Sequence, residues 1–258
     1  MANSLLVVHQ SPKSAISEAL RSIRTNLDFM SQLASKRTIS VTSTISGEGK
    51  TFVAVNLAGI IAMSSAKVII LDLDLRKPKV HLAFGMENVN GMSNLLIGKS
   101  TLDECIRQTV LPNLHFISAG PHPPNPAELL LSDEFERIIS KLKDMYDVVV
   151  FDTPPVGIVT DGIIAMRRAD LPIYIVRADY SKRAFISNIN RLITANNFNR
   201  MSVVLNSVDS GASYGYGYGY GYGYGYGYGY TTPSHGGYYE EDATTGFFQN
   251  LKSFFKRK

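Results

Sequence analysis

The first 206 residues alternate between short apolar runs and longer stretches in which apolar residues recur at helical spacing. Six of the runs are short and rich in β-branched or aromatic residues, which is the pattern of β-strands. These runs lie at 38–43, 67–73, 114–119, 147–152, 171–176 and 201–206. Several are almost continuously apolar, as expected of parallel strands that are covered on both faces.

Apolar residues at helical spacing are found at 14–34, 50–63, 133–145 and 182–196. The third of these stretches has a clear start signal, because Ser132 precedes two acidic residues. Strands that alternate with helices predict an α/β fold with a doubly wound, mainly parallel sheet flanked by helices. Ligands of such sheets bind at the carboxyl ends of the strands.

The pattern divides the chain into an N-terminal segment with a helix (1–36), a core (37–206) and a tail (207–258). Nine tyrosines alternate with single glycines from Tyr214 to Tyr230, a low-complexity composition that we expect to be disordered. The chain ends in GFFQNLKSFFKRK, whose apolar residues share one helical face beside basic residues. This end suits an anionic membrane surface or a protein surface.

Composition narrows the function classes. A net charge of +4 over 258 residues does not indicate a nucleic-acid-binding protein. The single cysteine, Cys105, excludes an internal disulfide and fits a reducing cytoplasm. No apolar run reaches membrane-spanning length, the start lacks a signal-peptide pattern, and the five histidines show no metal-ligand spacing. We therefore expect a soluble, cytoplasmic protein.

A candidate phosphate-binding loop, TSTISGEGKT (42–51), follows the first predicted strand and leads into an apolar helix. Backbone N–H groups of such a loop point at phosphate oxygens, Lys50 reaches the terminal phosphates, and the Thr51 hydroxyl can bind Mg²⁺. The sequence departs from GxxxxGK[ST] at Thr44, which replaces the first glycine. An ordinary β–α turn with an incidental lysine is the alternative. Besides Lys50 and Thr51, the expected nucleotide contacts here are Gly47, Glu48, Gly49 and Phe52.

Two further strands end in acidic residues. In VIILDLDLRKP (68–78), Asp72 and Asp74 would point to the same face of a regular strand, and Arg76 would extend their row. Carboxylates in a core are costly unless they are paired or bind a cation, although helix caps or surface charges are the alternative. In VVVFDTPP (148–155), Asp152 closes a buried strand, the usual place of an acidic Mg²⁺ ligand in P-loop enzymes.

Loop, double-aspartate strand and Asp-Thr-Pro-Pro strand occur in this order in the bacterial tyrosine kinases (BY-kinases), and over roughly 14–206 the chain closely resembles their catalytic domain. The segments resemble that family's Walker A, Walker A′ and Walker B motifs, and GPHPPNPAELL (120–130) is similar to a further family segment. The resemblance implies a P-loop NTPase-like fold. The family has an N-terminal helix with an ExxRxxR pattern, which it uses in subunit contacts that close a ring. The matching residues here are Glu18, Arg21 and Arg24. Ser46 stands where the family often has proline.

The resemblance also implies the chemistry. ATP and Mg²⁺ would be the cofactors, with Thr51, Asp74 and Asp152 around the metal and Asp72 as acceptor of the tyrosine proton. The sequence does not divide roles between the two aspartates of 68–78. Arg76 would stabilise the transferred phosphate or pair with an aspartate. Asn206 would contact adenine or simply end a strand.

The tyrosine tail matches a tyrosine cluster that closes the family's catalytic domains. A flexible Gly-rich tail of this length can reach the active site of a neighbouring subunit, so we expect that subunit to phosphorylate it. The added charge would weaken a ring held by tail docking. The expected acceptors are Tyr214, Tyr216, Tyr218, Tyr220, Tyr222, Tyr224, Tyr226, Tyr228, Tyr230, Tyr238 and Tyr239. The implied partners are other copies, a membrane-spanning activator (separate or fused) and protein substrates in capsule or exopolysaccharide synthesis. These partners imply that the protein lies in the cytoplasm, at the inner face of the plasma membrane.

Two other functions fit parts of the sequence. A non-kinase P-loop ATPase switch of the partitioning type would need a second lysine early in the loop, where Ile45 stands. An inactive scaffold that binds partners through its tyrosines would not need the intact set of Lys50, Thr51 and three aspartates. The segment after Asn206 lacks a guanine-reading Asn-Lys-x-Asp pattern, which favours ATP over GTP.

Overall fold

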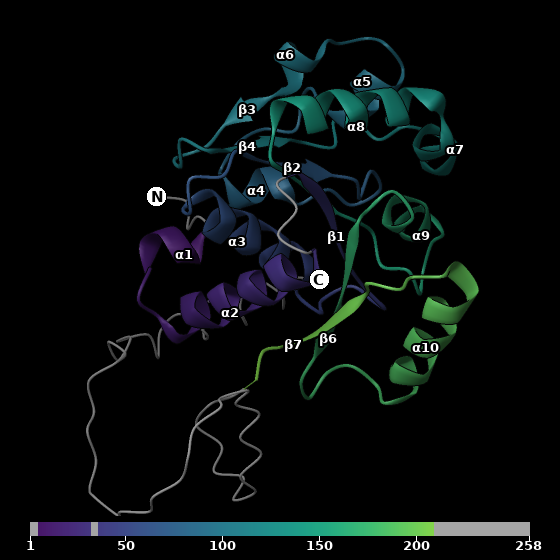
Figure 1. The fold of residues 1–258 in the computed structure, drawn as a ribbon. Coiled ribbons are helices and arrows are strands. Elements are labelled where there is room, and N and C mark those ends of the chain that lie inside the picture. The colour runs from purple at the N-terminus through teal and green to yellow at the C-terminus, as the bar shows by residue number, and fades with distance from the viewer. Residues whose placement is uncertain (1–4, 32–35, 209–258) are drawn as a thin grey trace, which may run out of the picture.

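The computed structural model describes residues 5–31 and 36–208. Its centre is a seven-stranded sheet in the order β3-β4-β2-β5-β1-β6-β7 (Figure 1). The strands are β1 (Arg37–Ser43), β2 (Val68–Asp72), β3 (Arg107–Gln108), β4 (Leu114–Ile117), β5 (Val148–Asp152), β6 (Leu171–Arg177) and β7 (Ser202–Asn206). All neighbours pair in parallel except β3 with β4. The predicted mainly parallel sheet is confirmed, and the expected acceptor tyrosines and the basic end lie outside the described residues.

Helices cover both faces of the sheet. They are α1 (Val7–Gln10), α2 (Ala15–Met30), α3 (Lys50–Ala62), α4 (Val80–Ala83), α5 (Met92–Leu96), α6 (Leu102–Cys105), α7 (Pro126–Leu131), α8 (Asp133–Met145), α9 (Asp161–Met166) and α10 (Ala184–Asn196). The four long helices match the predicted stretches. The short helices and the two-residue β3 were not predicted, because so few residues cannot display a periodicity.

The alternation of side chains along each strand separates two layers of core. Ile70 and Val150 face α2 and α3, whereas Ile69 and Val149 face α8 and α9. A smaller cluster joins β6 to α10. Figure 1 shows α2 and α3 on one side of the sheet and α8, α9 and α10 on the other. This three-layer arrangement is that of a doubly wound sheet.

Nearly every residue of α3 is buried, because α1 and α2 pack against it in addition to the sheet. A Cβ atom on Gly59 would lie 2.9 Å from side-chain atoms of both Leu6 and Val8, so glycine permits this close approach. The packing of α3 matters because its first residue, Lys50, belongs to the candidate site.

The predicted start of α8 at Ser132 is confirmed, because the Ser132 hydroxyl accepts the Phe135 N–H at 3.4 Å.

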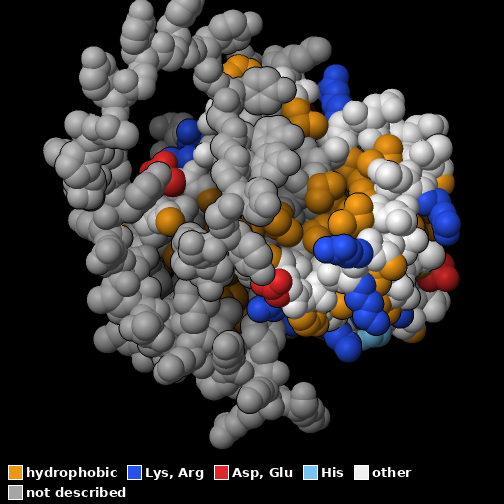
Figure 2. All heavy atoms as spheres, turned by 90° about the horizontal axis from the view of Figure 1, so that it is seen from below, with side chains coloured by type: hydrophobic (Ala, Val, Ile, Leu, Met, Phe, Trp, Pro, Cys, Tyr) orange, Lys and Arg blue, Asp and Glu red, His pale blue; other side chains and the backbone are white. Residues whose placement is uncertain are grey.

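Within the described residues, no helix combines the length and the apolar character that crossing a bilayer requires. Apolar side chains are nevertheless exposed on the edge strand β7, at Val203 and Leu205, and on α10, at Ile186. Figure 2 views the molecule from below and shows apolar side chains gathered among lysines and arginines on that face.

Candidate active site

The sheet brings the three sequence motifs to one edge. β5 lies between β1 and β2, and Asp72 and Asp152 are direct partners in the parallel register of β2 and β5. The loop that follows β1 begins at the same edge and ends at Lys50 of α3. The predicted juxtaposition of loop and acidic strand ends is therefore present.

The loop between β1 and α3 has the left-handed backbone that glycine favours at two positions. Gly47 has φ 90° and Gly49 has φ 94°. A Cβ atom on Gly49 would lie 2.1 Å from Nδ2 of Asn206, which donates a hydrogen bond of 3.0 Å to the Glu48 carbonyl. Glycine is thus required at position 49 by conformation and by space, and Asn206 at the end of β7 supports the loop.

The departure from the loop pattern at Thr44 has a structural reason. Thr44 has no positive φ, so its conformation does not require glycine. Its hydroxyl lies 2.7 Å from the buried Tyr174 hydroxyl, and its carbonyl accepts the Gly157 N–H at 3.0 Å. A Cβ atom on Gly157 would approach that carbonyl oxygen to 2.5 Å. The close contact at this point of the loop therefore needs a glycine at position 157, in the segment after Asp152, and not at position 44.

Lys50 is buried among three carboxylates. Its Nζ lies 3.2 Å from Oδ2 of Asp74. Burial by itself lowers the pKa of Lys50, but the charges of Asp152, Asp74 and Asp72 outweigh this effect, and the pKa lies above its usual value. The loop therefore ends in a firmly protonated ammonium group, as binding of terminal phosphates requires.

Thr51 and Asp152 form the second half of the site. The Thr51 hydroxyl donates to Oδ2 of Asp152 at 2.6 Å. Oδ1 of Asp152 is buried and receives no hydrogen bond from the described residues. Burial raises the pKa of Asp152, since a desolvated carboxylate is costly. An unpartnered carboxylate oxygen beside a hydroxyl is a fitting ligand pair for Mg²⁺.

Asp72 and Asp74 play different structural parts. β2 ends at Asp72, so the strand geometry that would align Asp74 and Arg76 with it does not extend to them. Asp72 is fully buried and accepts the N–H groups of Lys79 and Val80, both at 2.9 Å, and that of Asp74 at 3.2 Å. Burial, reinforced by the charge of Asp152, raises the pKa of Asp72 to about 8. Asp74 lies in the following turn, where it holds Lys50.

Arg76 pairs with an aspartate, one of the two roles expected for it. Its Nε donates to Oδ2 of Asp161 at 2.8 Å, and its Nη2 donates to Oδ1 at 3.4 Å. Asp161 is buried at the start of α9. The sequence did not single out this partner, because one aspartate after a loop is too common to be a signal.

The end of β6 and the segment after it also contact the phosphate loop, and sequence reasoning missed these contacts. Nη1 of Arg177 donates to the Gly47 carbonyl at 2.9 Å, and the Tyr180 hydroxyl donates to the Ser46 carbonyl at 3.1 Å. Ser181 donates to the carboxylate of Glu48. These residues carry no recognisable motif, and only the pairing of β6 with β1 brings them to the loop.

Two residues expected to contact the nucleotide turn their side chains inward. Glu48 is fully buried and accepts the Ile45 N–H at 2.8 Å, so its carboxylate holds the shape of the loop. Phe52, in the first turn of α3, is half-buried and packs against the core on that side of the sheet. Only the backbone of Glu48 is available to a phosphate.

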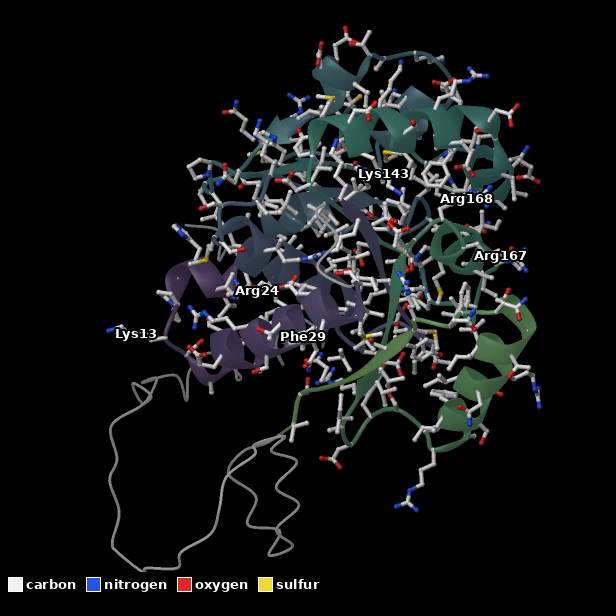
Figure 3. The ribbon with its side chains drawn as sticks, in the orientation of Figure 1. Lys13, Arg24, Phe29, Lys143, Arg167 and Arg168 are labelled. Atoms are coloured by element: carbon white, nitrogen blue, oxygen red, sulfur yellow. The ribbon has the colours of Figure 1, made fainter. Side chains whose placement is uncertain are left out.

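The predicted subunit-contact residues lie on α2, away from the loop. Glu18 pairs with Arg21, which also donates to the Pro12 carbonyl at 2.7 Å. Arg24 faces α3 and donates to the Ile60 carbonyl at 3.5 Å (Figure 3). Phe29, near the end of α2, is largely exposed. The predicted contact with another copy stays a prediction.

Comparisons with known proteins show the family of the chain. Residues 36–201 match the family described as AAA domain. The putative tyrosine-protein kinase CapB of Staphylococcus aureus is 37% identical over 213 residues, which cover 82% of this chain and 93% of CapB. The tyrosine-protein kinase YwqD of Bacillus subtilis is 38% identical over 172 residues, covering 67% of this chain and 73% of YwqD.

A solved structure adds the spatial match. The kinase domain of the Escherichia coli tyrosine kinase ETK aligns with a TM-score of 0.75 and 32% identity, covering 84% of this chain and 85% of that domain. With the loop, its lysine and the aspartate-bearing strand ends in place, the chain belongs to the bacterial tyrosine-protein kinases.

Proposed function

We propose that the chain transfers the γ-phosphoryl group of Mg²⁺-ATP to protein tyrosines, including the tyrosines of its own tail in a second copy. One observation carries the cofactor assignment. The buried Oδ1 of Asp152 has no hydrogen-bond partner in the described part of the chain, and it lies beside the Thr51 hydroxyl at the end of a loop that closes on Lys50. Membership of the tyrosine kinase family supports the choice of acceptor.

Phosphoryl transfer depends mainly on positioning and on neutralisation of charge. Lys50 and the N–H groups of residues 47–51 would hold the phosphates, and Thr51 and Asp152 would hold Mg²⁺, which neutralises charge on the phosphate oxygens. Phosphates compete with Asp74 for Lys50, since both are anionic. Binding of the nucleotide therefore frees the Asp74 carboxylate for the metal shell.

Asp72 remains the proposed proton acceptor. A phenol with a pKa near 10 is protonated at neutral pH, and a carboxyl group with a pKa near neutrality suits a general base. Burial raises the pKa of Asp72 to about 8, so its carboxylate binds a proton more strongly than that of an exposed aspartate. Its three backbone donors support a second role, the shaping of the turn that carries Asp74.

Incubation with Mg²⁺-ATP followed by peptide mass spectrometry tests the proposal. Phosphotyrosine is expected in 214–239 of the unmodified chain and in a Lys67→Met control, whose lysine is exposed at the opposite edge of the sheet. It is expected to be absent from Lys50→Met alone and to return when Lys50→Met is mixed with active enzyme. ATP hydrolysis without phosphotyrosine would instead support a partitioning-type ATPase switch, and neither activity would support a scaffold.

Assembly and place in the cell belong to the same proposal. Glu18 and Arg21 keep partly exposed side chains, so they remain available to a neighbouring copy in a ring. A membrane-spanning activator, separate or fused, would hold the kinase at the inner face of the plasma membrane, where substrates of capsule or exopolysaccharide synthesis lie. Arg21→Ala with Arg24→Ala is expected to lower the mass measured by light scattering; an unchanged mass would contradict the ring contact.

A further inference from the structure

The described residues contain three tyrosines in very different surroundings. Tyr146 and Tyr174 are only 6% and 2% exposed, and their hydroxyls meet His115 and Thr44. Tyr180 is 48% exposed and lies in the segment after β6. Of the tyrosines in the described part of the chain, Tyr180 is thus the one that another protein can reach.

Tyr180 rests directly on the phosphate loop. Its hydroxyl donates to the Ser46 carbonyl at 3.1 Å, and a Cβ atom on Gly47 would lie 2.8 Å from that hydroxyl oxygen. The Arg177 guanidinium lies 5.1 Å from the centre of the Tyr180 ring and also donates to the Gly47 carbonyl. Arg177 and Tyr180 together hold two successive peptide groups of the loop.

We propose that Tyr180 is an acceptor for a second copy of the kinase and that its phosphorylation releases this hold on the loop. The inference rests on the proposed function. The Tyr180 oxygen bonds to the γ-phosphorus of ATP and the bond from that phosphorus to the bridging oxygen breaks. ADP leaves with the electron pair, and the phenol proton passes to a carboxylate of the catalysing copy. The hydroxyl donates to its own loop rather than to Asp72, Asp74 or Asp152, which is why the catalysing site belongs to another copy.

Phosphorylated Tyr180 cannot keep its present place. The hydroxyl loses the proton that it donates to Ser46, and a phosphate oxygen would face the carbonyl oxygen instead. The distance of 2.8 Å to a Cβ position on Gly47 leaves no room for a phosphoryl group between ring and loop. The added charge, about −1.5 to −2, would also repel the phosphates of a bound nucleotide.

Arg177 has a reason to leave the loop with the modified tyrosine. A guanidinium pairs more strongly with a phosphate dianion than with the neutral Gly47 carbonyl that it now contacts. Ser46 and Gly47 would then lose both supports, while Glu48 would keep its contacts with Ser181 and Asn206. A phosphate loop with fewer supports and a nearby negative charge should bind the nucleotide more weakly. Phosphorylation of Tyr180 would therefore lower the activity of the modified kinase.

A test of Tyr180 as an acceptor requires that the tyrosines of the tail be removed, because they compete for the phosphate. Of the fourteen tyrosines of the chain, eleven lie in 214–239. An acceptor chain with Lys50→Met and these eleven changed to phenylalanine retains Tyr146, Tyr174 and Tyr180. Unmodified kinase and Mg²⁺-ATP are expected to place phosphate on Tyr180, and no phosphate on the same acceptor with Tyr180→Phe.

The comparison acceptor is Lys50→Met with its natural tail. Phosphate on that tail without phosphate on Tyr180 would overturn the inference and leave the proposed function intact. Phosphate on neither would overturn both. For the switch, the tail-phenylalanine kinase with phosphorylated Tyr180 is expected to bind a fluorescent ADP analogue at least tenfold more weakly than after treatment with a tyrosine phosphatase. Equal affinity before and after treatment would overturn the release of the loop.

Discussion

The contact between Asn206 and the phosphate loop gives a prediction that can be worked through in energies. In Gly49→Ala, an L-residue must adopt φ 94°, at a cost of about 1–2 kcal/mol. Its Cβ atom must also displace the Asn206 amide, which lies 2.1 Å from the Cβ position. The hydrogen bond to the Glu48 carbonyl is then lost, at a further cost of about 1 kcal/mol. The free energy of unfolding should fall by about 2–3 kcal/mol.

A double-mutant cycle separates the two contributions. Asn206→Ala removes the amide and should cost about 1 kcal/mol by itself. In that background, Gly49→Ala should cost only the conformational part, so the two changes should fall short of additivity by about 1 kcal/mol. Guanidinium unfolding resolves this difference, because independent sites add within about 0.3–0.5 kcal/mol. Full additivity would refute the view that Asn206 supports the loop.

The same variant decides whether Asn206 also contacts adenine. If Asn206 acts only through the loop, Asn206→Ala should weaken binding of ADP and of inorganic tripolyphosphate by the same factor in calorimetry. A loss confined to ADP would assign Asn206 to the base, because tripolyphosphate has none.

Three further outcomes follow from the site. Asp152→Asn should abolish the Mg²⁺ dependence of ADP binding while leaving metal-free binding within about twofold, because it removes the carboxylate charge beside the unpartnered Oδ1; a preserved Mg²⁺ dependence would contradict the ligand role. The folded-state pKa of Asp72, about 8, lies above its ordinary value, so its contribution to stability is complete below about pH 4 and is lost as the pH rises towards 8. Burial also raises the pKa of Asp152, and a protonated carboxyl group is a poor metal ligand. Stabilisation by Mg²⁺-ADP in thermal unfolding should therefore grow as the pH rises, and a flat response would count against Asp152 as a ligand. Arg76→Gln and Asp161→Asn should lower Tm equally, and the double variant should lower it no further, because they break one pair; a fall of kcat in Arg76→Gln alone would place Arg76 on the transferred phosphate.

The layered sheet and the place of the site were predictable, because both depend on patterns that repeat along the chain. Almost continuous apolar runs marked the inner strands, and parallel strands bring their carboxyl ends to one edge. That rule alone placed Lys50 near Asp152, although 101 residues separate Thr51 from its hydrogen-bond partner. Short elements such as β3 and α9 escaped, since they carry too few residues for a period to appear.

What the sequence could not supply was the partner of each polar side chain. Asp72 and Asp74 looked equivalent as alternate residues of one strand, yet the strand ends between them and only Asp72 receives the Lys79 and Val80 amides. The pairing of Arg76 with Asp161 could not be predicted either. Such pairings are set by turns whose conformation has no periodic signature.

The loop itself shows why a short motif describes a phosphate site incompletely. Its shape is fixed from outside the motif: Gly157 packs on Thr44, Tyr180 on Ser46, and Asn206 on Glu48. Gly157 and Tyr180 come from the segments after β5 and β6, and Asn206 is the last residue of β7, so the motif keeps its geometry only within the assembled sheet. The glycine of the usual pattern can therefore be absent at position 44, where φ is not positive, whereas a side chain at position 49 is costly, because φ is 94° there and the Asn206 amide lies at the Cβ position. Substitutions at Gly157 and Asn206 should accordingly affect nucleotide binding as much as substitutions within the loop.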